Sequence, residues 1–468
     1  MLFSPQNLTL GDGRFDIPKT MVATAHPCFN KEVIKEFWSN FTFGSSSLEI
    51  CETAEPIFRV GDTKCIPLSG CEYSVNIEKD GFCIFAEDES GLFHGFMALL
   101  DRIRSDDGED GILPFLDSCS FREKPYIEHR MVHFCVFPET ELWELRKFLR
   151  FTAALKYTHV VLEFWGTFKY DAMRELTWEN AFTREELSPI IREARDLGVE
   201  IIPMFNHWGH AAASRARHGK HVVLDQNPAL QTYFSDDGWC WDIAKPKVRA
   251  LLKSVRRELM ELCGEGKYFH IGCDEAYNFA FTEENMDMIT GFINEVSRDL
   301  SECNRRAIAW GDMFLYRYEH YNKENKYECN APTPEASKYL LSRLDKNVVI
   351  ADWQYDSPKA PVETSAVFSE AGFDSLICPW DRGRAHTRAA ISTVKEMSLM
   401  GILHTTWHTL SDGMPIVALT AIESFTPLPA DSRLAVRIVT AALLRRVMPT
   451  HGNYEMSGWS RIQTHYLW

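Results

Sequence analysis

The chain has 468 residues, which is too long for one ordinary domain and long enough for a barrel with a smaller companion domain. Its hydrophobic content of 45% supplies material for a core, and its formal net charge of -16 argues against nucleic acid or an anionic membrane as the main partner. No run of about 18 or more apolar residues is present in the sequence, which excludes a membrane-spanning helix.

The N-terminal residues and the cysteines bear on the cellular compartment. The first residues lack a basic segment followed by an apolar one, so no signal peptide is predicted, although a chain trimmed of its leader would look the same. The 13 cysteines are an odd number without paired spacings, and several lie in apolar runs, including Cys83, Cys135 and Cys378. Reduced, buried cysteines are typical of cytosolic proteins, so we expect a cytoplasmic location. The sequence does not indicate an oligomeric state.

Residues 1–120 predict a small α+β domain. Two strand-like runs over residues 73–86 are joined at Asp80 and Gly81, which is a hairpin pattern. Residues 91–103 then carry apolar side chains at helical spacing. The polar, turn-rich residues 104–124 predict the boundary of this domain.

From residue 125 to residue 468 the pattern changes to short apolar strands that alternate with longer amphipathic segments. This alternation predicts βα units around a parallel sheet, and about eight strands are the number that closes a (β/α)8, or TIM, barrel. Thr183 and Glu186 form a capping box at the start of one helix, and Gly198 ends it. The predicted strands span residues 130–137, 158–164, 199–205, 268–271, 307–310, 348–353, 375–379 and 402–407.

The stretch Tyr-Phe-His-Ile-Gly-Cys-Asp-Glu, residues 268–275, is a short apolar run that ends on two adjacent carboxylates. In a barrel of parallel strands, catalytic side chains lie at the C-terminal ends of the strands. Desolvation and like-charge repulsion can drive the pKa values of two crowded carboxylates apart, so that one serves as a general acid. Asp274 and Glu275 are therefore the candidate catalytic residues. The alternative is that they begin the next helix, where acids favour the dipole.

The segment His270-Ile-Gly-Cys-Asp274-Glu275 resembles the His-x-Gly-x-Asp-Glu signature of glycoside hydrolase family 20, the β-N-acetylhexosaminidases. The cysteine before Asp-Glu resembles the hexosaminidase D branch of that family. The strand, strand and glycine-led helix of residues 73–103 are similar to the small domain that precedes family 20 barrels. The resemblance implies an exo-acting enzyme that removes terminal β-linked GlcNAc or GalNAc from a small glycan, with no cofactor and no metal ion.

The resemblance also implies a retaining, substrate-assisted mechanism, in which the carbonyl oxygen of the 2-acetamido group attacks the anomeric carbon and forms an oxazolinium intermediate. Glu275 would protonate the leaving oxygen and then take a proton from water. Asp274 would orient the acetamido nitrogen and stabilise the positive charge. Neighbouring side chains on a regular strand point to opposite faces, so both can reach one substrate only if the backbone leaves strand geometry after Gly272.

Two basic side chains at strand ends are candidate sugar ligands. The resemblance implies that Arg130, at the start of the first barrel strand, donates hydrogen bonds to sugar hydroxyls, and a guanidinium can hold two vicinal hydroxyls. The alternative for Arg130 is a structural ion pair. His210 follows a glycine where the family has a histidine that reaches toward the acid. His207 is left open, because His207 and His210 have no third ligand at a spacing typical of a metal site.

Aromatic residues end several of the predicted strands. A tryptophan most often packs in a core, but indole faces at successive strand ends can enclose one pyranose ring. The resemblance implies that the tryptophans surround the acetamido methyl group and that Tyr355 hydrogen-bonds to its carbonyl oxygen. The candidates are Trp310, Trp353, Tyr355, Trp380 and Trp407.

The sequence departs from the family pattern at two positions that are usually acidic, where it has Gly166 and Thr409. Asp381 or Asp412 could compensate for the second change. These departures favour one alternative function, a catalytically silent carbohydrate-binding protein on the same barrel. Another alternative is a retaining β-glycosidase with a separate carboxylate nucleophile, such as Glu163. The sequence does not distinguish GlcNAc from GalNAc as the substrate, and it does not predict the linkage.

Overall fold

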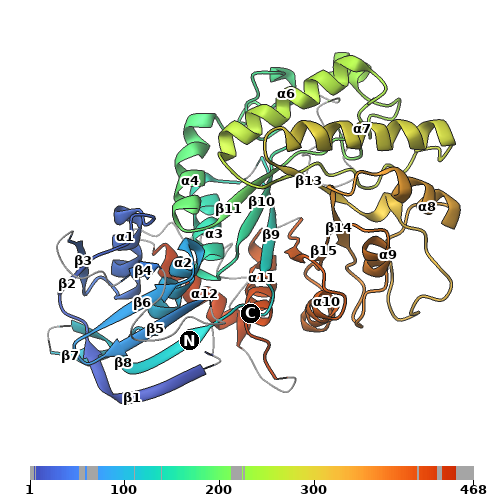
Figure 1. Ribbon diagram of the computed structural model, residues 1–468. Coiled ribbons are helices and arrows are strands. Elements are labelled where there is room, and N and C mark those ends of the chain that lie inside the picture. Colours follow the sequence, from blue (N-terminus) through green and yellow to red (C-terminus); the bar gives the residue numbers. More distant parts are fainter. Residues whose placement is uncertain are drawn as a thin grey trace.

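The computed structural model describes residues 5, 7–51, 58–60, 72–109, 111–138, 140–211, 224, 227–407, 410–429 and 435–449. A small N-terminal domain built on a mixed sheet lies beside a closed barrel of parallel strands (Figure 1). The predicted fold class, a (β/α)8 barrel preceded by a small α+β domain, is confirmed.

The small domain is organised around a six-stranded sheet. Its strands lie in the order β1-β8-β5-β6-β4, and β7 pairs with β8. The predicted hairpin is present, because β5 and β6 pair antiparallel with Glu78 opposite Gly81. Helix α2 packs on β5 and β6, and β2 and β3 form a separate parallel pair. The elements are β1 (Asn7–Asp16), β2 (Thr20–Ala23), α1 (Lys31–Phe41), β3 (Ser47–Ile50), β4 (Phe58–Val60), β5 (Tyr73–Glu78), β6 (Gly81–Ala86), α2 (Glu89–Asp101), β7 (Arg104–Gly108) and β8 (Gly111–Glu123).

Residues 104–124, which the sequence predicts to be a turn-rich boundary, are mostly strand. These residues form the antiparallel pair β7 and β8, and β8 also pairs with β1 and β5. The polar run that resembled a linker is the exposed strand β7, whereas β8 buries Leu116, Cys119 and Phe121. The sheet of the small domain therefore continues to Glu123.

All eight predicted barrel strands are present, within one or two residues of the predicted limits at most ends. They pair in parallel around a closed ring in which β16 returns to β9. The strands are β9 (His129–Cys135), β10 (His159–Glu163), β11 (Glu200–Met204), β12 (Tyr268–His270), β13 (Arg306–Trp310), β14 (Val349–Trp353), β15 (Ser375–Cys378) and β16 (Gly401–His404).

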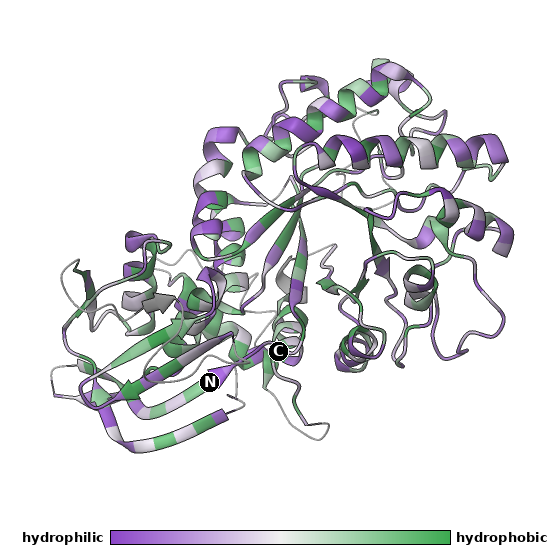
Figure 2. Cartoon of the chain, viewed as in Figure 1, coloured by the Kyte–Doolittle hydropathy of each residue, from purple (hydrophilic) through white to green (hydrophobic). Residues whose placement is uncertain are grey.

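Helices surround the barrel strands on the outside (Figure 1). The barrel strands are mostly hydrophobic, while α6 and α7 alternate between hydrophilic and hydrophobic residues, as expected for helices with one face on the sheet (Figure 2). No helix in the described ranges is long and apolar enough to cross a membrane. The helices are α3 (Leu142–Ala154), α4 (Arg184–Asp196), α6 (Pro246–Cys263), α7 (Glu283–Ser301), α8 (Pro334–Arg343), α9 (Thr364–Glu370), α10 (Arg384–Glu396), α11 (Leu410–Phe425) and α12 (Val436–Val447), with 3-10 turns η1 (Arg174–Leu176), η2 (Pro228–Tyr233) and η3 (Asp312–Phe314).

The predicted capping box begins α4. The Thr183 side chain accepts a hydrogen bond from the Glu186 backbone N–H, and the Glu186 side chain accepts one from the Thr183 backbone N–H. Gly198 follows the helix with a φ of +80°.

The interior of the barrel changes character along the strands. Alternate residues of each strand point inward, and an apolar cluster of such residues includes Met131, Val161 and Ile202. Toward the C-terminal ends of the strands, polar side chains such as His133 and Glu163 take the same inward positions and are fully buried. This polar end of the barrel holds the candidate site.

The cysteines of the described ranges are free thiols. Of the three that lie in apolar runs, Cys135 and Cys378 are buried and Cys83 is partly buried.

Candidate functional site

The loop after β12 carries the two candidate catalytic carboxylates. The backbone leaves strand geometry directly after the strand, because Gly272, Cys273 and Glu275 all have positive φ values of 67°, 79° and 49°. A Cβ atom on Gly272 would lie 2.0 Å from the Asn206 Oδ1 atom, so this position also requires glycine sterically. The predicted departure from strand geometry is confirmed, and it turns Asp274 and Glu275 toward a common neighbour.

That common neighbour is His210. Its Nε2 atom lies 3.2 Å from Oδ2 of Asp274 and 3.1 Å from Oε2 of Glu275. Burial alone would lower the pKa of His210, but the two carboxylates outweigh it and raise the pKa to about 10. His210 is therefore a protonated imidazolium at neutral pH. The structure brings together the three residues that the sequence singled out here.

The loop after β11 packs closely against the loop after β12, and this packing places His210 against the carboxylates. The backbone N–H of His207 donates to the carbonyl of Ile271, at 2.8 Å. A Cβ atom on Gly209 would lie 1.9 Å from the backbone oxygen of Asp274, so the loops can approach this closely only with glycine here. His207 itself is fully buried, and its Nδ1 atom hydrogen-bonds to the carbonyl of Phe205, which makes it a structural residue.

Asp312, in η3 after β13, is a site residue that the sequence analysis did not identify. Its carboxylate accepts hydrogen bonds from the Glu275 backbone N–H at 3.0 Å, the Trp353 indole at 3.0 Å and the Asn330 side chain at 2.7 Å. Burial and the charge of Asp274 raise the pKa of Asp312 to about 7. An acid two residues beyond a predicted strand, in Trp310-Gly-Asp, was the available signal.

Trp239 is a second residue that the sequence analysis missed. Its indole N–H donates to the backbone carbonyl of Glu275 at 2.6 Å, and its ring lies 4.4 Å from that of His210. The Tyr277 ring also stacks on the Trp239 ring, with the two ring centroids 6.1 Å apart. Trp239 lies in a loop far from any predicted strand end, so no pattern in the sequence marked it.

Four of the five predicted aromatic residues line one connected, partly accessible surface. Trp407 donates an indole hydrogen bond to the Tyr355 hydroxyl. The Tyr355 ring lies 5.0 Å from Trp353 and 5.3 Å from Trp380. Tyr355, Trp380 and Trp407 are partly exposed, and Trp353 is 8% exposed. Such a half-buried aromatic group matches the apolar faces of a pyranose ring.

The prediction that Trp310 contacts the sugar is wrong. Trp310 has no exposed surface and packs between the rings of His270, at 4.3 Å, and Trp407, at 5.5 Å. It is the last inward-pointing residue of β13, so it fills the barrel beneath the aromatic group instead of lining it.

The prediction that Arg130 contacts sugar hydroxyls is also wrong. Arg130 is at the start of β9, at the opposite end of the strand from the carboxylates, and it is 1% exposed. Its guanidinium donates to the backbone carbonyls of Lys156, Ile127 and Glu128 at 2.7–3.0 Å. Arg130 therefore has a structural role, but its hydrogen-bond partners are backbone carbonyl groups and not the carboxylate of the expected ion pair.

Of the two positions where the family usually has an acid, the structure describes Gly166. A Cβ atom on Gly166 would lie 2.7 Å from the Leu176 carbonyl oxygen, so no larger side chain fits without moving the backbone. Thr409 and the side chain of Asp412 lie outside the described residues. Asp381 is exposed next to Trp380.

Glu163, the alternative nucleophile, is only 1% exposed. Its Oε1 atom accepts a hydrogen bond from the Asn206 side chain at 2.9 Å, and its Oε2 atom accepts one from the Cys135 thiol at 3.0 Å. The carboxylate is thus held inside the barrel, which argues against direct attack on a substrate.

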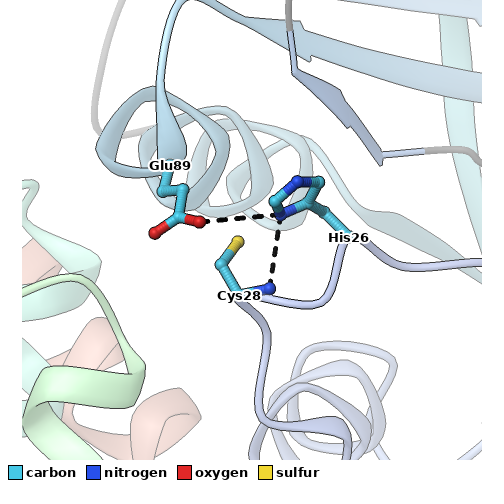
Figure 3. A group of neighbouring side chains, drawn as sticks. All are labelled: His26, Cys28 and Glu89. Carbon is cyan, nitrogen blue, oxygen red and sulfur yellow. Dashed lines mark hydrogen bonds and ion pairs between the residues drawn. The ribbon is translucent and has the colours of Figure 1, made fainter.

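Two groups of side chains in the described ranges have a composition that could hold a metal ion. One lies at the surface of the small domain and contains His26, Cys28 and Glu89 (Figure 3). There the His26 Nδ1 atom already accepts the Cys28 backbone N–H at 3.3 Å, and burial and Glu89 raise the pKa of the Cys28 thiol to about 12, which disfavours the thiolate. The other group, His133, Cys135 and Glu163, is fully buried in the barrel.

Residues 158–382, from β10 to just beyond β15, match the family model "Glycosyl hydrolase family 20, catalytic domain". This match to glycosyl hydrolase family 20 covers just under half of the chain. The recognised family is therefore confirmed, and the resemblance to its hexosaminidase D branch stays a prediction.

The curated relatives that match this chain are distant. The chain is 22% identical over 260 residues to a lacto-N-biosidase of Bifidobacterium bifidum, which covers 51% of the chain and 22% of that protein. It is 22% identical over 357 residues to a beta-hexosaminidase of Porphyromonas gingivalis, which covers 66% of the chain and 45% of that protein. The chain thus spans less than half the length of either relative.

Solved family 20 structures share the fold across the whole chain. An exo beta-N-acetylglucosaminidase from Vibrio harveyi in complex with N-acetylglucosamine superposes with a TM-score of 0.68 at 15% identity, over 100% of this chain and 78% of that one. A beta-N-acetylhexosaminidase from Streptomyces coelicolor gives a TM-score of 0.67 at 16% identity, over 96% of both chains.

Proposed function

We propose that the protein is an exo-acting β-N-acetylhexosaminidase that removes terminal β-linked GlcNAc or GalNAc with retention of configuration. The convergence of Asp274 and Glu275 on His210 carries this proposal. The match of residues 158–382 to the family 20 catalytic domain supports it, as do the names of similar proteins, a beta-hexosaminidase and an exo beta-N-acetylglucosaminidase.

The geometry suits substrate-assisted catalysis. The Oδ1 atom of Asp274 is buried and has no hydrogen-bond partner in the described part of the chain, so it is an acceptor available to the N–H of a 2-acetamido group. That bond would orient the acetamido carbonyl oxygen for attack on the anomeric carbon, and the carboxylate would stabilise the oxazolinium charge.

Glu275 would act as the general acid and then as the general base. Its side chain is 26% exposed, in contrast to 7% for that of Asp274, so it can reach a leaving group and later a water molecule. The protonated His210 balances one of the two negative charges and fixes both carboxylates. Asp312 and Trp239 hold the Glu275 backbone from both sides through its N–H and its carbonyl.

Release of p-nitrophenol from the β-N-acetylglucosaminide and the β-N-acetylgalactosaminide tests the proposal. We expect activity in the wild type and a fall of about 10² or more in kcat for Glu275→Gln and for Asp274→Asn. Glu370→Gln and Asp107→Asn, at exposed acids that make none of the contacts described for the site, are the matched controls and should retain activity. The faster substrate would identify the preferred epimer.

The same assay separates the alternatives. Turnover of the corresponding 2-hydroxy glucoside or galactoside would favour a separate nucleophile, which the burial of Glu163 opposes. An inert wild type that still binds a GlcNAc-thiazoline analogue would identify a carbohydrate-binding protein and contradict the hydrolase proposal.

A further inference from the structure

Strand geometry brings three potential metal ligands together inside the barrel. His133 and Cys135 are separated by one residue on β9, so their side chains point to the same face. Glu163, the last residue of β10, is the direct parallel partner of Cys135. All three are at most 1% exposed. An imidazole, a thiol and a carboxylate therefore meet at the C-terminal ends of two adjacent strands.

The distances between the three ligand atoms lie within about 0.5 Å of those on one face of a coordination tetrahedron. Oε2 of Glu163 lies 3.0 Å from Sγ of Cys135 and 3.3 Å from Nε2 of His133, and Sγ and Nε2 are 3.8 Å apart. A tetrahedral zinc ion with ordinary bond lengths to nitrogen, oxygen and sulfur places its ligand atoms roughly 3.3–3.6 Å apart. Little movement would be needed to place an ion among them.

We propose that His133, Cys135 and Glu163 bind a divalent transition-metal ion, with zinc as the best match. Thiolate and imidazole ligands favour this class of ion over calcium and magnesium, and three protein ligands leave a fourth position for water. On binding, the thiol proton is released to solvent, the imidazole is neutral and the carboxylate is ionised. This site departs from the expectation that the protein holds no metal ion.

The surroundings resemble the outer shell of a metal site. The side chain of Asn206 donates a hydrogen bond to Oε1 of Glu163, which orients Oε2 toward the other two ligands. His270, on β12, interacts electrostatically with both His133 and Glu163. Its Nδ1 atom accepts the Gly272 N–H, and its buried Nε2 has no partner among the described residues, as expected beside an ordered water.

The site adjoins the aromatic group without being part of it. The His133 ring lies 4.7 Å from that of Trp407, and the Thr406 hydroxyl donates to the His133 carbonyl at 2.8 Å. An ion here would brace the residues beneath the aromatic group. The inference does not depend on the proposed hydrolase activity, because metal binding can be measured without turnover.

Cobalt substitution in the full chain tests the proposal. The protein is dialysed against a chelator and titrated with Co²⁺, and its absorption spectrum is recorded. We expect one Co²⁺ per chain, a thiolate-to-cobalt charge-transfer band and loss of that band when Zn²⁺ is added. Cys135→Ser should remove the band, whereas Cys28→Ser, in the surface group of Figure 3, should keep it.

Two further variants keep the test decisive if Cys135→Ser does not fold. His133→Gln and Glu163→Gln should each raise the Kd for Zn²⁺ by at least the roughly 10–100-fold that loss of an outer-shell partner costs. Circular dichroism checks that each variant is folded. A wild type that binds neither ion, a band that survives Cys135→Ser or is lost in Cys28→Ser, or an unchanged Kd in both glutamine variants would overturn the proposal.

Discussion

His210 is the residue that links the two candidate catalytic carboxylates. Its imidazolium contacts both, and the Trp239 ring covers it at 4.4 Å. Its own backbone has a φ of 56°, an uncommon value for a residue other than glycine. Folding therefore holds this side chain in an unfavourable backbone conformation to keep one proton between two acids.

The raised pKa of His210 predicts a specific pH dependence of stability. The pKa is about 10 in the folded protein and near 6.5 in the unfolded chain, so folding favours the protonated form. This contribution is complete below about pH 6.5 and is lost as the pH rises toward 10. Wild type should exceed His210→Asn in free energy of unfolding by roughly 2–4 kcal/mol at pH 6 and by much less at pH 10.

Urea unfolding of both proteins at the two pH values measures this difference. Gly291→Ala, which changes no titratable group, serves as the control, and its difference from wild type should be the same at both pH values. An equal difference at pH 6 and pH 10 would show that His210 is not charged in the folded protein.

At the level of single residues, the sequence identified the side chains that carry the chemistry better than it identified the contacts that each side chain makes. Asp274, Glu275 and His210 were predicted from a motif and from their positions after barrel strands, and in the structure their side chains are in contact. Arg130 and Trp310 occupy strand positions too, but Arg130 lies at the start of its strand, away from the site, and Trp310 points into the closed barrel. Asp312 reaches the site through a turn after β13, and turn geometry is not visible in the spacing of residues.

At the level of elements, the barrel strands were predictable because each is a short apolar run between turn residues and amphipathic helices. Strand β7 was missed because it carries two exposed aspartates, Asp106 and Asp107. An edge strand with no buried face has no hydrophobic periodicity to detect.

The close packing of the loops after β11 and β12 leads to a prediction about Gly209. A methyl group there would lie 1.9 Å from the Asp274 carbonyl oxygen, which belongs to the backbone and cannot rotate away. Gly209→Ala should therefore separate His210 from the carboxylates and reduce kcat by about 10²-fold, as a 1 Å misplacement can. The hexosaminide assay measures the loss, and circular dichroism should show an intact fold.

Gly291, inside helix α7, provides a matched control. A methyl group there meets no atom within 4 Å, and alanine is the better helix former. Gly291→Ala should leave kcat unchanged and stabilise the protein by about 0.5–1 kcal/mol. Full activity in Gly209→Ala would show that the loops tolerate separation and that close packing is not required.

At the level of the whole molecule, buried charges join the small domain to the barrel. Lys156, between α3 and β10, is fully buried and donates to the Tyr73 hydroxyl at 2.7 Å, with Glu123 at 3.5 Å. Both partners belong to the sheet of the small domain. Nearby, Arg150 of α3 forms two hydrogen bonds of 2.6 Å with Glu36 of α1. These contacts indicate that the two domains unfold together.

The fully buried pair Lys156 and Glu123 provides the test of that coupling. Lys156→Met leaves the Glu123 carboxylate buried without its cation, which typically costs about 3–5 kcal/mol. The double variant Lys156→Met with Glu123→Gln removes both charges and should recover much of that loss. Lys359→Met, which breaks an exposed ion pair with Glu324, should cost less than about 1 kcal/mol.

Calorimetry should show one transition that moves to lower temperature in Lys156→Met, because the barrel cannot stay folded once the small domain detaches. Two separate transitions, with only the smaller one displaced, would instead mean that the barrel is stable alone and that the small domain is a dependent attachment.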